Sequence, residues 1–199
     1  ELKYSDPDAI YLNALGLTRH PFINFYNCTN IKFVGRGVLD LSHLDRRERR
    51  GVVFTQCKNI EVSGIKIVNS PEWSFISYRC ENLTIKDVDI FGYRQNSDAF
   101  AICNTQGGTI DRCFARSGDD LFDVKTLGGP LDASAENITF KNCVAWGGKA
   151  RCYGIHGEVN RPIKNITFRD SAVICRDATW NNNRVASLAV VVELAEGSI

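Results

Sequence analysis

Three aspartates lie in two segments of the sequence that align with each other without a gap. Residues 97–102 read Ser-Asp-Ala-Phe-Ala-Ile and residues 119–124 read Asp-Asp-Leu-Phe-Asp-Val, which sets Asp98 against Asp120 with Asp119 beside them. If the two segments stack as neighbouring strands, these carboxylates lie about 4.8 Å apart. Like charges at that distance raise the pKa of at least one carboxyl group. A protonated carboxyl beside an ionised one can cleave a glycosidic bond, whereas the same cluster could also bind Ca²⁺ or form a solvated turn.

A histidine and a tryptophan occur in neighbouring repeats of the same sequence. His156 lies between Gly154 and Gly157, which would leave its imidazole exposed and let a sugar approach, or it is a turn residue without a role. Trp73 lies one repeat before Asp98 and is either a platform for a sugar ring or a buried core residue.

A short repeat predicts the elements that must position these residues. Asparagine followed by alternating apolar residues recurs along the chain, with anchors at Phe33, Val62, Ile85, Ile110, Phe140 and Phe168. Alternation with a period of two residues predicts short strands that bury one face. Stacked parallel coils satisfy such strands, so the sequence predicts an all-β fold, a parallel β-helix of about six coils.

Residues 1–199 are expected to form a single domain, and to be part of a longer catalytic domain. The chain contains no Met at all, and neither end of the predicted solenoid reads as an evident cap.

Two residue types fall into columns of this repeat. Asparagine stands three residues before most anchors, at positions 30, 59, 82, 137 and 165, which predicts a hydrogen-bonded ladder at a corner. Five of the eight cysteines share two other columns, at positions 28, 57 and 80 and at 113 and 143, which predicts small apolar residues inside the coil. One disulfide among Cys103, Cys152 and Cys175 stays open, and the absence of a Cys-x-x-Cys pair makes a zinc or redox site unexpected.

The composition excludes several classes of protein. With 24 Lys and Arg against 23 Asp and Glu, and 44% hydrophobic residues, the chain is neither disordered nor basic enough to favour nucleic-acid binding. No apolar run approaches the roughly 20 residues that span a bilayer, so we expect no membrane partner. The charged run at residues 45–50 either lines a groove for an acidic polysaccharide or forms a solvated loop.

Four ordered motifs resemble those of glycoside hydrolase family 28, the polygalacturonase-like branch of the pectin lyase-like β-helix superfamily. They are Asn-Ser-Pro-Glu-Trp at 69–73, Asn-Ser-Asp-Ala at 96–99, Gly-Asp-Asp at 118–120 followed by Lys125, and Gly-Ile-His-Gly at 154–157. The resemblance implies a right-handed parallel β-helix that hydrolyses a pectin-type bond of a plant or microbial polysaccharide with inversion. It also implies a secreted or periplasmic monomer that uses no cofactor and no metal ion.

The resemblance assigns roles residue by residue. It makes Asp119 the general acid, and it makes Asp98 and Asp120 the pair that holds and deprotonates the attacking water. His156 would lie beside the acid as a fourth catalytic residue. The residues assigned to substrate binding are Asn96, Lys125 and Trp73.

The sequence also departs from the family pattern. Ala99 replaces a glycine, Ile155 separates the glycine from the histidine, and Arg161-Pro-Ile-Lys164 falls at a predicted corner instead of supplying the family's cation pair for a substrate carboxylate. A neutral sugar therefore stays open beside a uronate. Two other functions also stay open, a Ca²⁺-dependent polysaccharide lyase on the same scaffold and a non-catalytic β-helix that binds glycans.

Overall fold

The structure is a computed structural model that describes residues 21–129, 132–147, 149–176, 188–190 and 193–194. These residues form strands β1 to β20 and no helix. It follows that no apolar helix long enough to cross a membrane occurs among them.

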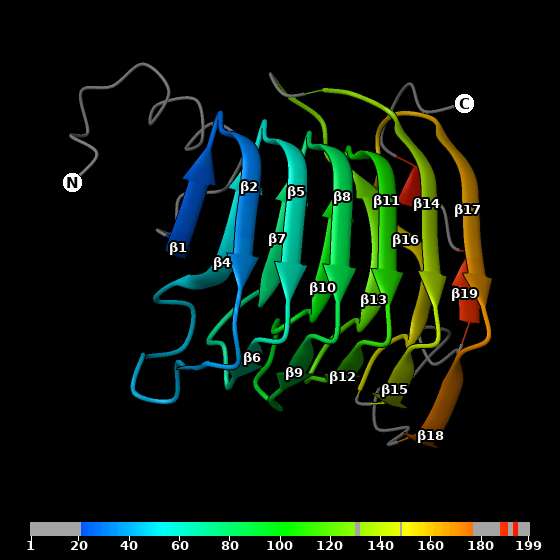
Figure 1. The fold of residues 1–199 in the computed structure, drawn as a ribbon. Helices are drawn as coiled ribbons and strands as arrows, with labels where there is room; N and C mark the ends of the chain where they lie inside the picture. The colour runs from blue at the N-terminus through cyan, green and yellow to red at the C-terminus, as the bar shows by residue number, and fades with distance from the viewer. Residues whose placement is uncertain (1–20, 130–131, 148, 177–187, 191–192, 195–199) are drawn as a thin grey trace.

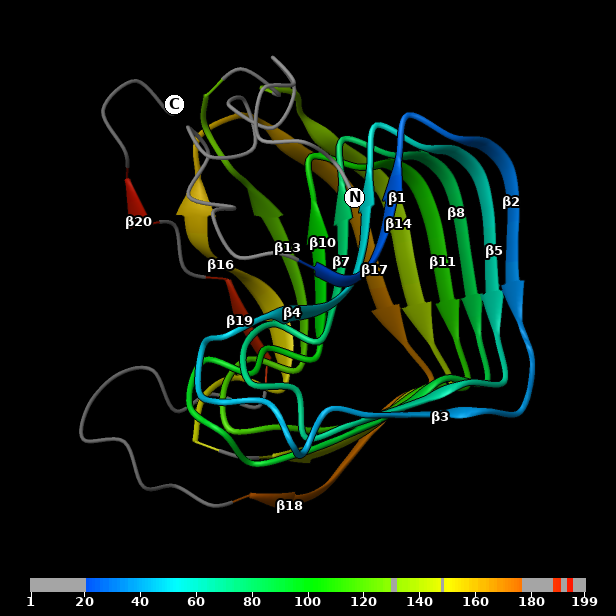
Figure 2. The same ribbon diagram turned by 90° about the vertical axis from the view of Figure 1, so that its left-hand side faces the viewer.

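The strands build three parallel sheets that run side by side along one axis (Figures 1 and 2). The first sheet holds β1 (Pro21–Tyr26), β4 (Arg50–Thr55), β7 (Phe75–Tyr78), β10 (Phe100–Cys103), β13 (Phe122–Thr126), β16 (Tyr153–Val159), β19 (Leu188–Val190) and β20 (Glu193–Leu194). The second holds β2 (Thr29–Val34), β5 (Lys58–Ser63), β8 (Glu81–Lys86), β11 (Gln106–Asp111), β14 (Ala135–Lys141) and β17 (Ile163–Arg169). The third holds β3 (Val38–Asp40), β6 (Lys66–Val68), β9 (Asp89–Phe91), β12 (Phe114–Arg116), β15 (Val144–Gly147) and β18 (Ala172–Arg176).

The chain visits the three sheets in turn, so one coil consists of one strand from each sheet. Every strand pairs in parallel with the strand one coil before or after it, and the second and third sheets each stack six strands. This confirms the predicted all-β parallel solenoid.

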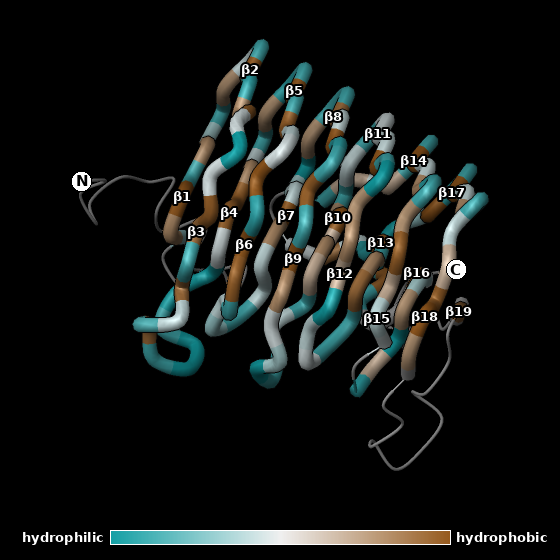
Figure 3. The backbone as a smooth tube through the Cα atoms, turned by 60° about the horizontal axis from the view of Figure 1, so that its bottom comes forward, coloured by the Kyte–Doolittle hydropathy of each residue, from teal (hydrophilic) through white to brown (hydrophobic). Residues whose placement is uncertain are grey.

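The core lies inside the coils, where the alternating residues point. The anchors Val62, Ile85, Ile110 and Phe140 are buried, and the hydropathy along the chain alternates accordingly in Figure 3. Aromatic rings stack from coil to coil beneath the first sheet, with neighbouring centroids between 4.5 and 6.0 Å apart. The members of this aromatic stack are Phe25, Phe54, Phe75, Phe100, Phe122 and Tyr153.

The predicted asparagine ladder forms the corner that leads into the second sheet. All five asparagines have positive φ angles, between 53° and 59°, a conformation that asparagine tolerates better than most residues. Side-chain amides join them from coil to coil, Asn59 to Asn30 at 2.9 Å, Asn82 to Asn59 at 3.0 Å and Asn165 to Asn137 at 2.9 Å. Gly107, with a φ of 76°, takes the place of asparagine in the coil between.

Six of the eight cysteines are buried, Cys28 is partly buried and Cys175 is exposed, and all eight carry free thiols. In the first predicted column, the Cys57 thiol donates to the carbonyl of Thr55 at 3.3 Å and to that of Phe25 at 3.4 Å. The disulfide that the sequence left open is therefore not formed.

Candidate active site

The three aspartates lie in two turns that lead from the third sheet into the first. Asp98 precedes β10, and Asp119 with Asp120 precedes β13, the strand stacked on β10. The backbone N–H of Ala99 donates to the carbonyl of Asp120 at 2.8 Å, which holds the two turns together. Because β10 and β13 pair in the expected register, Asp98 stacks on Asp120 as predicted.

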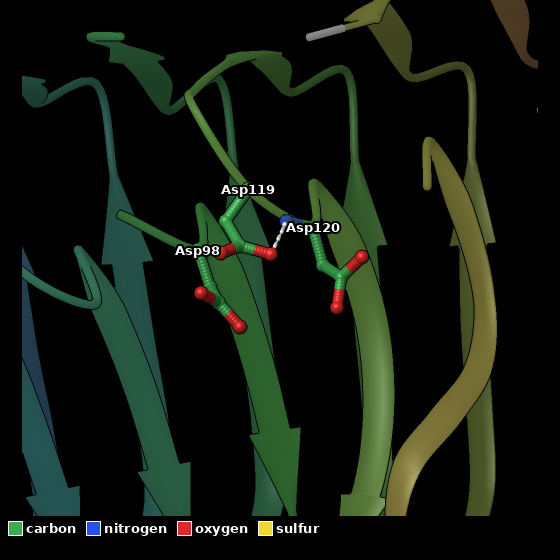
Figure 4. A group of neighbouring side chains, drawn as sticks. All are labelled: Asp98, Asp119 and Asp120. Atoms are coloured by element: carbon green, nitrogen blue, oxygen red, sulfur yellow. Dashed lines mark hydrogen bonds between the residues drawn. The ribbon is translucent and has the colours of Figure 1, made fainter. Parts of the chain in front are cut away.

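The three carboxylates lie side by side and extend to the same side of the two turns (Figure 4). One oxygen atom from each lies within 4.8 Å of the other two. The backbone N–H of Asp120 donates to Asp119 Oδ1 at 3.0 Å, which fixes the second carboxylate. The exposed fractions of Asp98, Asp119 and Asp120 are only 3%, 8% and 6%.

Burial raises the pKa of two of these carboxyl groups, those of Asp98 and Asp119, toward neutral pH. It raises the pKa of Asp98 to about 7, with Lys125 opposing the rise and the charges of Asp119 and Asp120 adding to it. It also raises the pKa of Asp119 to about 6, again with a contribution from Asp120. The site can therefore keep one carboxyl group protonated beside an ionised one. Hydrolysis by general acid–base catalysis needs such a proton donor and proton acceptor.

Lys125 supplies a buried positive charge at the floor of the site. Its Nζ donates to Asp98 Oδ2 at 3.0 Å and lies 3.2 Å from Asp123 Oδ2 and 3.6 Å from Glu158 Oε2. Burial alone would lower the pKa of Lys125, but the carboxylates of Asp123, Asp98 and Glu158 raise it well above its ordinary value. The ammonium is thus charged, and it orients Asp98. The sequence alone did not point to Asp123 or Glu158, although the alternation of β13 places Asp123 on the same outer face as Lys125.

A third coil adds Arg151, which the sequence analysis also missed. Its backbone N–H donates to Asp120 Oδ1 at 3.1 Å, and its guanidinium Nη1 lies 3.7 Å from Asp120 Oδ2. Phe122 pairs with Tyr153, so residue 151 stacks on residue 120. Extending the alignment of the aspartate segments by one coil would have found it.

Trp73 lies half-buried between two cations. The guanidinium of Arg50 is 4.9 Å from its ring centroid and Lys125 Nζ is 4.3 Å from the same ring. Arg50 is itself buried and forms an ion pair with Glu72 at 3.3 Å. The indole therefore packs against the inner wall of the site, next to the lysine that holds Asp98.

The charged run at residues 45–50 folds onto the turn that carries Asp98. Arg47 donates to Asn96 Oδ1 at 2.8 Å, and Arg46 donates to Gln95 Oε1 at 2.6 Å. Asn96 has a φ of 59°, which helps reverse the chain just before Asp98. Residues 45–48 of this run are exposed, so it is a solvated loop that Arg46 and Arg47 tie to the turn before Asp98.

His156 lies in β16, which stacks on β13. The pairing of these strands shifts register, because the step from Val124 to Thr126 faces the longer step from Ile155 to Val159. The histidine belongs to the extra residues of this bulge, and its side chain lies outside what the structure describes. Its expected position beside the acid remains a prediction.

The charges around the cluster fit proton transfer better than a Ca²⁺ ion. Three carboxylate oxygens come close enough to share an ion, but Ca²⁺ takes six to eight oxygen ligands. Lys125 already binds Asp98, and Arg151 lies against Asp120. Two of the three carboxylates are therefore engaged by cations of the protein itself.

Comparison with known proteins agrees with this arrangement. The family model for glycosyl hydrolases family 28 matches residues 23–189. Endopolygalacturonase I of Aspergillus aculeatus is 33% identical over 126 residues, which is 60% of this chain and 31% of the relative. A polygalacturonase of Chamaecyparis obtusa is 25% identical over 161 residues, 76% of this chain and 30% of the relative. An exopolygalacturonase of Zea mays is 34% identical over 94 residues, 46% of this chain and 22% of the relative.

The chain thus spans less than a third of the length of these curated relatives. A solved structure, that of a hyperthermoactive exopolygalacturonase from Thermotoga maritima, has the same fold, with a TM-score of 0.66 at 20% identity over 76% of this chain and 46% of that one. Since the family match extends from β1 into β19 and includes both aspartate turns, the chain belongs to family 28 of the glycosyl hydrolases.

Proposed function

We propose that the protein carrying this chain hydrolyses a glycosidic bond in a pectin-type polysaccharide that contains galacturonate. The observation that supports this most is the buried cluster of Asp98, Asp119 and Asp120, in which the pKa values of Asp98 and Asp119 are raised. The names of the relatives, polygalacturonases from a fungus and from plants, supply the substrate class. Such an enzyme meets its polymer outside the cell, so we expect it to be secreted or periplasmic, and to act as a monomer.

Asp119 is the proposed general acid. No ion pair joins Asp119 to any residue that the structure describes, whereas Asp98 is paired with Lys125 and Asp120 with Arg151. The pKa values of Asp98 and Asp119, about 7 and about 6, are close enough that the two groups share a proton. Because the pKa of Asp98 stays the higher of the two even with Lys125 beside it, the assignment of the acid to Asp119 rests on the family motif and on the lack of an ion pair between Asp119 and the described residues, which leaves its carboxyl available to the leaving oxygen.

Asp98 and Asp120 are then the proposed base, since each is paired with a cation, Lys125 or Arg151, and both carboxylates lie close to that of Asp119. They would orient the attacking water and accept its proton. Asn96 and Trp73 line the edge of the site and are proposed to contact the substrate, and His156 is proposed to lie beside the acid.

The stereochemical outcome is part of this proposal. For paired carboxylates, separations of about 6.5–9.5 Å accompany inversion and shorter ones accompany retention. The three carboxylates here are closer than that wide spacing. The expectation of inversion therefore rests on the family motifs, and the anomeric configuration of the first product, read by NMR, checks it.

Replacing the acid tests the proposal directly. We expect Asp119→Asn to lower the release of reducing ends from polygalacturonate by about 10³-fold, because the leaving oxygen is no longer protonated. The matched control is Asp87→Asn, which removes an exposed carboxylate paired with Arg112 at another corner and should leave activity within about twofold. Full activity of the Asp119 variant would refute the assignment.

The same assay separates hydrolysis from elimination. A lyase would produce unsaturated ends that absorb in the ultraviolet and would lose activity in a chelator, since it would need Ca²⁺ on the aspartates. We expect neither effect.

A further inference from the structure

An arginine lies between two aromatic rings at the corner where the third sheet leads into the first. The guanidinium carbon of Arg116 is 4.6 Å from the ring centroid of Trp146 and 5.6 Å from that of Tyr93. Arg116 and Trp146 are direct partners in the neighbouring strands β12 and β15. We call Tyr93, Arg116, Trp146 and Lys149 the corner cage, because the Nζ of Lys149 lies 5.3 Å from the Tyr93 ring as well.

The two cations of the corner cage have no anionic partner within the described part of the chain. Arg116 Nε is buried without a hydrogen-bond partner, and no carboxylate pairs with Arg116 or Lys149. The other cations at this edge differ, since Arg50, Lys125 and Arg151 each pair with a carboxylate. A guanidinium kept partly buried with unmade hydrogen bonds is costly, and an anionic ligand would satisfy it.

The corner cage is reachable and next to the candidate active site. Tyr93 is 38% exposed. A Cβ placed on Gly118 would lie 2.1 Å from the carbonyl oxygen of Arg94 and 2.9 Å from the carbonyl carbon of Tyr93, so the turn before Asp119 packs directly on the turn that contains Tyr93.

In each of three neighbouring coils, a residue of the corner cage is followed along the chain by a residue of the candidate active site. The pairs, in chain order, are Tyr93 with Asp98, Arg116 with Asp119, and Lys149 with Arg151. A polymer bound across the aspartates can therefore extend over the cage.

We propose that the corner cage is a subsite for one acidic sugar of the polymer, with Arg116 binding its carboxylate. A planar guanidinium binds a carboxylate through two parallel hydrogen bonds, and aromatic rings pack on the apolar face of a sugar. A galacturonate ring offers both features. This subsite would supply the cations that the sequence lacks at the family's Arg-Ile-Lys position, and it deepens the proposed function, on which it rests.

Binding in a catalytically inert background tests the corner cage. In Asp119→Asn, oligogalacturonate is not cut, so its affinity can be measured by isothermal titration calorimetry at low salt. We expect the further change Arg116→Gln to weaken this affinity about tenfold, the size expected for one missing charge-assisted hydrogen bond. The affinity for the methyl-esterified oligomer, which carries no charge, should not change.

Matched variants separate recognition from folding. Arg112→Gln removes the same charge from an exposed arginine that pairs with Asp87 at 2.8 Å at another corner, and it should leave the affinity within about twofold. Arg116→Lys keeps the charge without the planar fork and should fall between the parent and Arg116→Gln. Lys149→Gln, on the loop after β15, should weaken binding by a smaller factor without a change in the unfolding midpoint.

Three outcomes would overturn the proposal. They are unchanged oligogalacturonate affinity in Arg116→Gln, an equal loss for the methyl-esterified oligomer, and an equal loss in Arg112→Gln. The proposed function is tested by a different measurement. It would fail if the unsubstituted protein did not cleave polygalacturonate. The corner cage would stand in that case if binding still depended on Arg116.

Discussion

At the scale of single residues, the candidate site contains two carboxyl groups, those of Asp98 and Asp119, whose pKa values burial raises. Asp119 shows this most clearly, because its pKa rises to about 6 while no ion pair with a described residue offsets its charge. Function and stability therefore oppose each other at this residue. A proton donor that works near neutral pH is one whose ionised form destabilises the fold above that pH.

The pH dependence of stability in Asp119→Asn measures this opposition. The folded pKa lies above the unfolded one, so the folded state binds more protons, and stability falls as the pH rises from about 4 to about 6. Asparagine has no charge to bury, so we expect it to raise the free energy of unfolding at pH 8 by roughly 2 kcal/mol more than at pH 4. Urea unfolding of both proteins at the two pH values checks this. A difference that is the same at both would contradict it.

The stacked aspartates could be predicted from the sequence, but their charge partners could not. The gapless alignment of two segments fixes the register that sets Asp98 on Asp120. Lys125 extends from β13 to Asp98, which lies in the turn before the neighbouring strand β10, whereas Glu158 comes from a strand with a bulge. A bulge changes which residues of two strands face each other. In a single sequence whose loops already vary in length, a bulge cannot be recognised.

At the scale of elements, the corners decide where each coil turns, and the asparagine ladder is the most regular of them. Asn59 both donates to Asn30 and accepts from Asn82, with a φ of 54°. The repeat predicted this column because asparagine combines tolerance of positive φ with a side chain that bonds to the next coil. Gly107 has a positive φ, as the asparagines do, but no side-chain amide. The backbone conformation of the corner is therefore kept even where the ladder hydrogen bond is absent.

Two substitutions at Asn59 separate these contributions. Asn59→Gly keeps the backbone conformation and loses both ladder hydrogen bonds, so we expect it to lower the free energy of unfolding by about 1–2 kcal/mol. Asn59→Ala also places a Cβ at positive φ and should lower it by roughly a further 1 kcal/mol. Urea unfolding ranks the two, and an alanine variant at least as stable as the glycine variant would argue against backbone conformation as part of the ladder's role.

At the scale of the whole molecule, the fold is one-dimensional, since each coil contacts mainly the coils before and after it. That property made the solenoid predictable, because a short repeat with alternating apolar residues has few other ways to bury its face. The corner cage was not predictable, because it joins an outward row of the third sheet to turns of unequal length. The sequence shows Tyr93, Arg116 and Trp146 only as three separate residues on three coils.

The aromatic stack beneath the first sheet tests how far this one-dimensional picture holds. Phe100 lies inside the stack, fully buried, with ring centroids of Phe75 at 6.0 Å and Phe122 at 5.0 Å, so its removal opens a cavity between two neighbouring coils. We expect Phe100→Ala to lower the free energy of unfolding by about 3–5 kcal/mol, the usual effect of a cavity left by a buried ring.

The matched variant is Phe25→Ala, since Phe25 is only partly buried and stacks on Phe54 at 4.5 Å in one neighbouring coil. We expect it to cost roughly half as much, because within the described residues this ring stacks on a neighbouring coil on one side, whereas Phe100 stacks on one on each side. Urea unfolding of the two variants makes the comparison. Equal losses of stability would mean that stability is shared along the entire stack and is not passed from coil to coil. In that case the site in the middle of the solenoid would be as sensitive to a change in β1 as to one in β10.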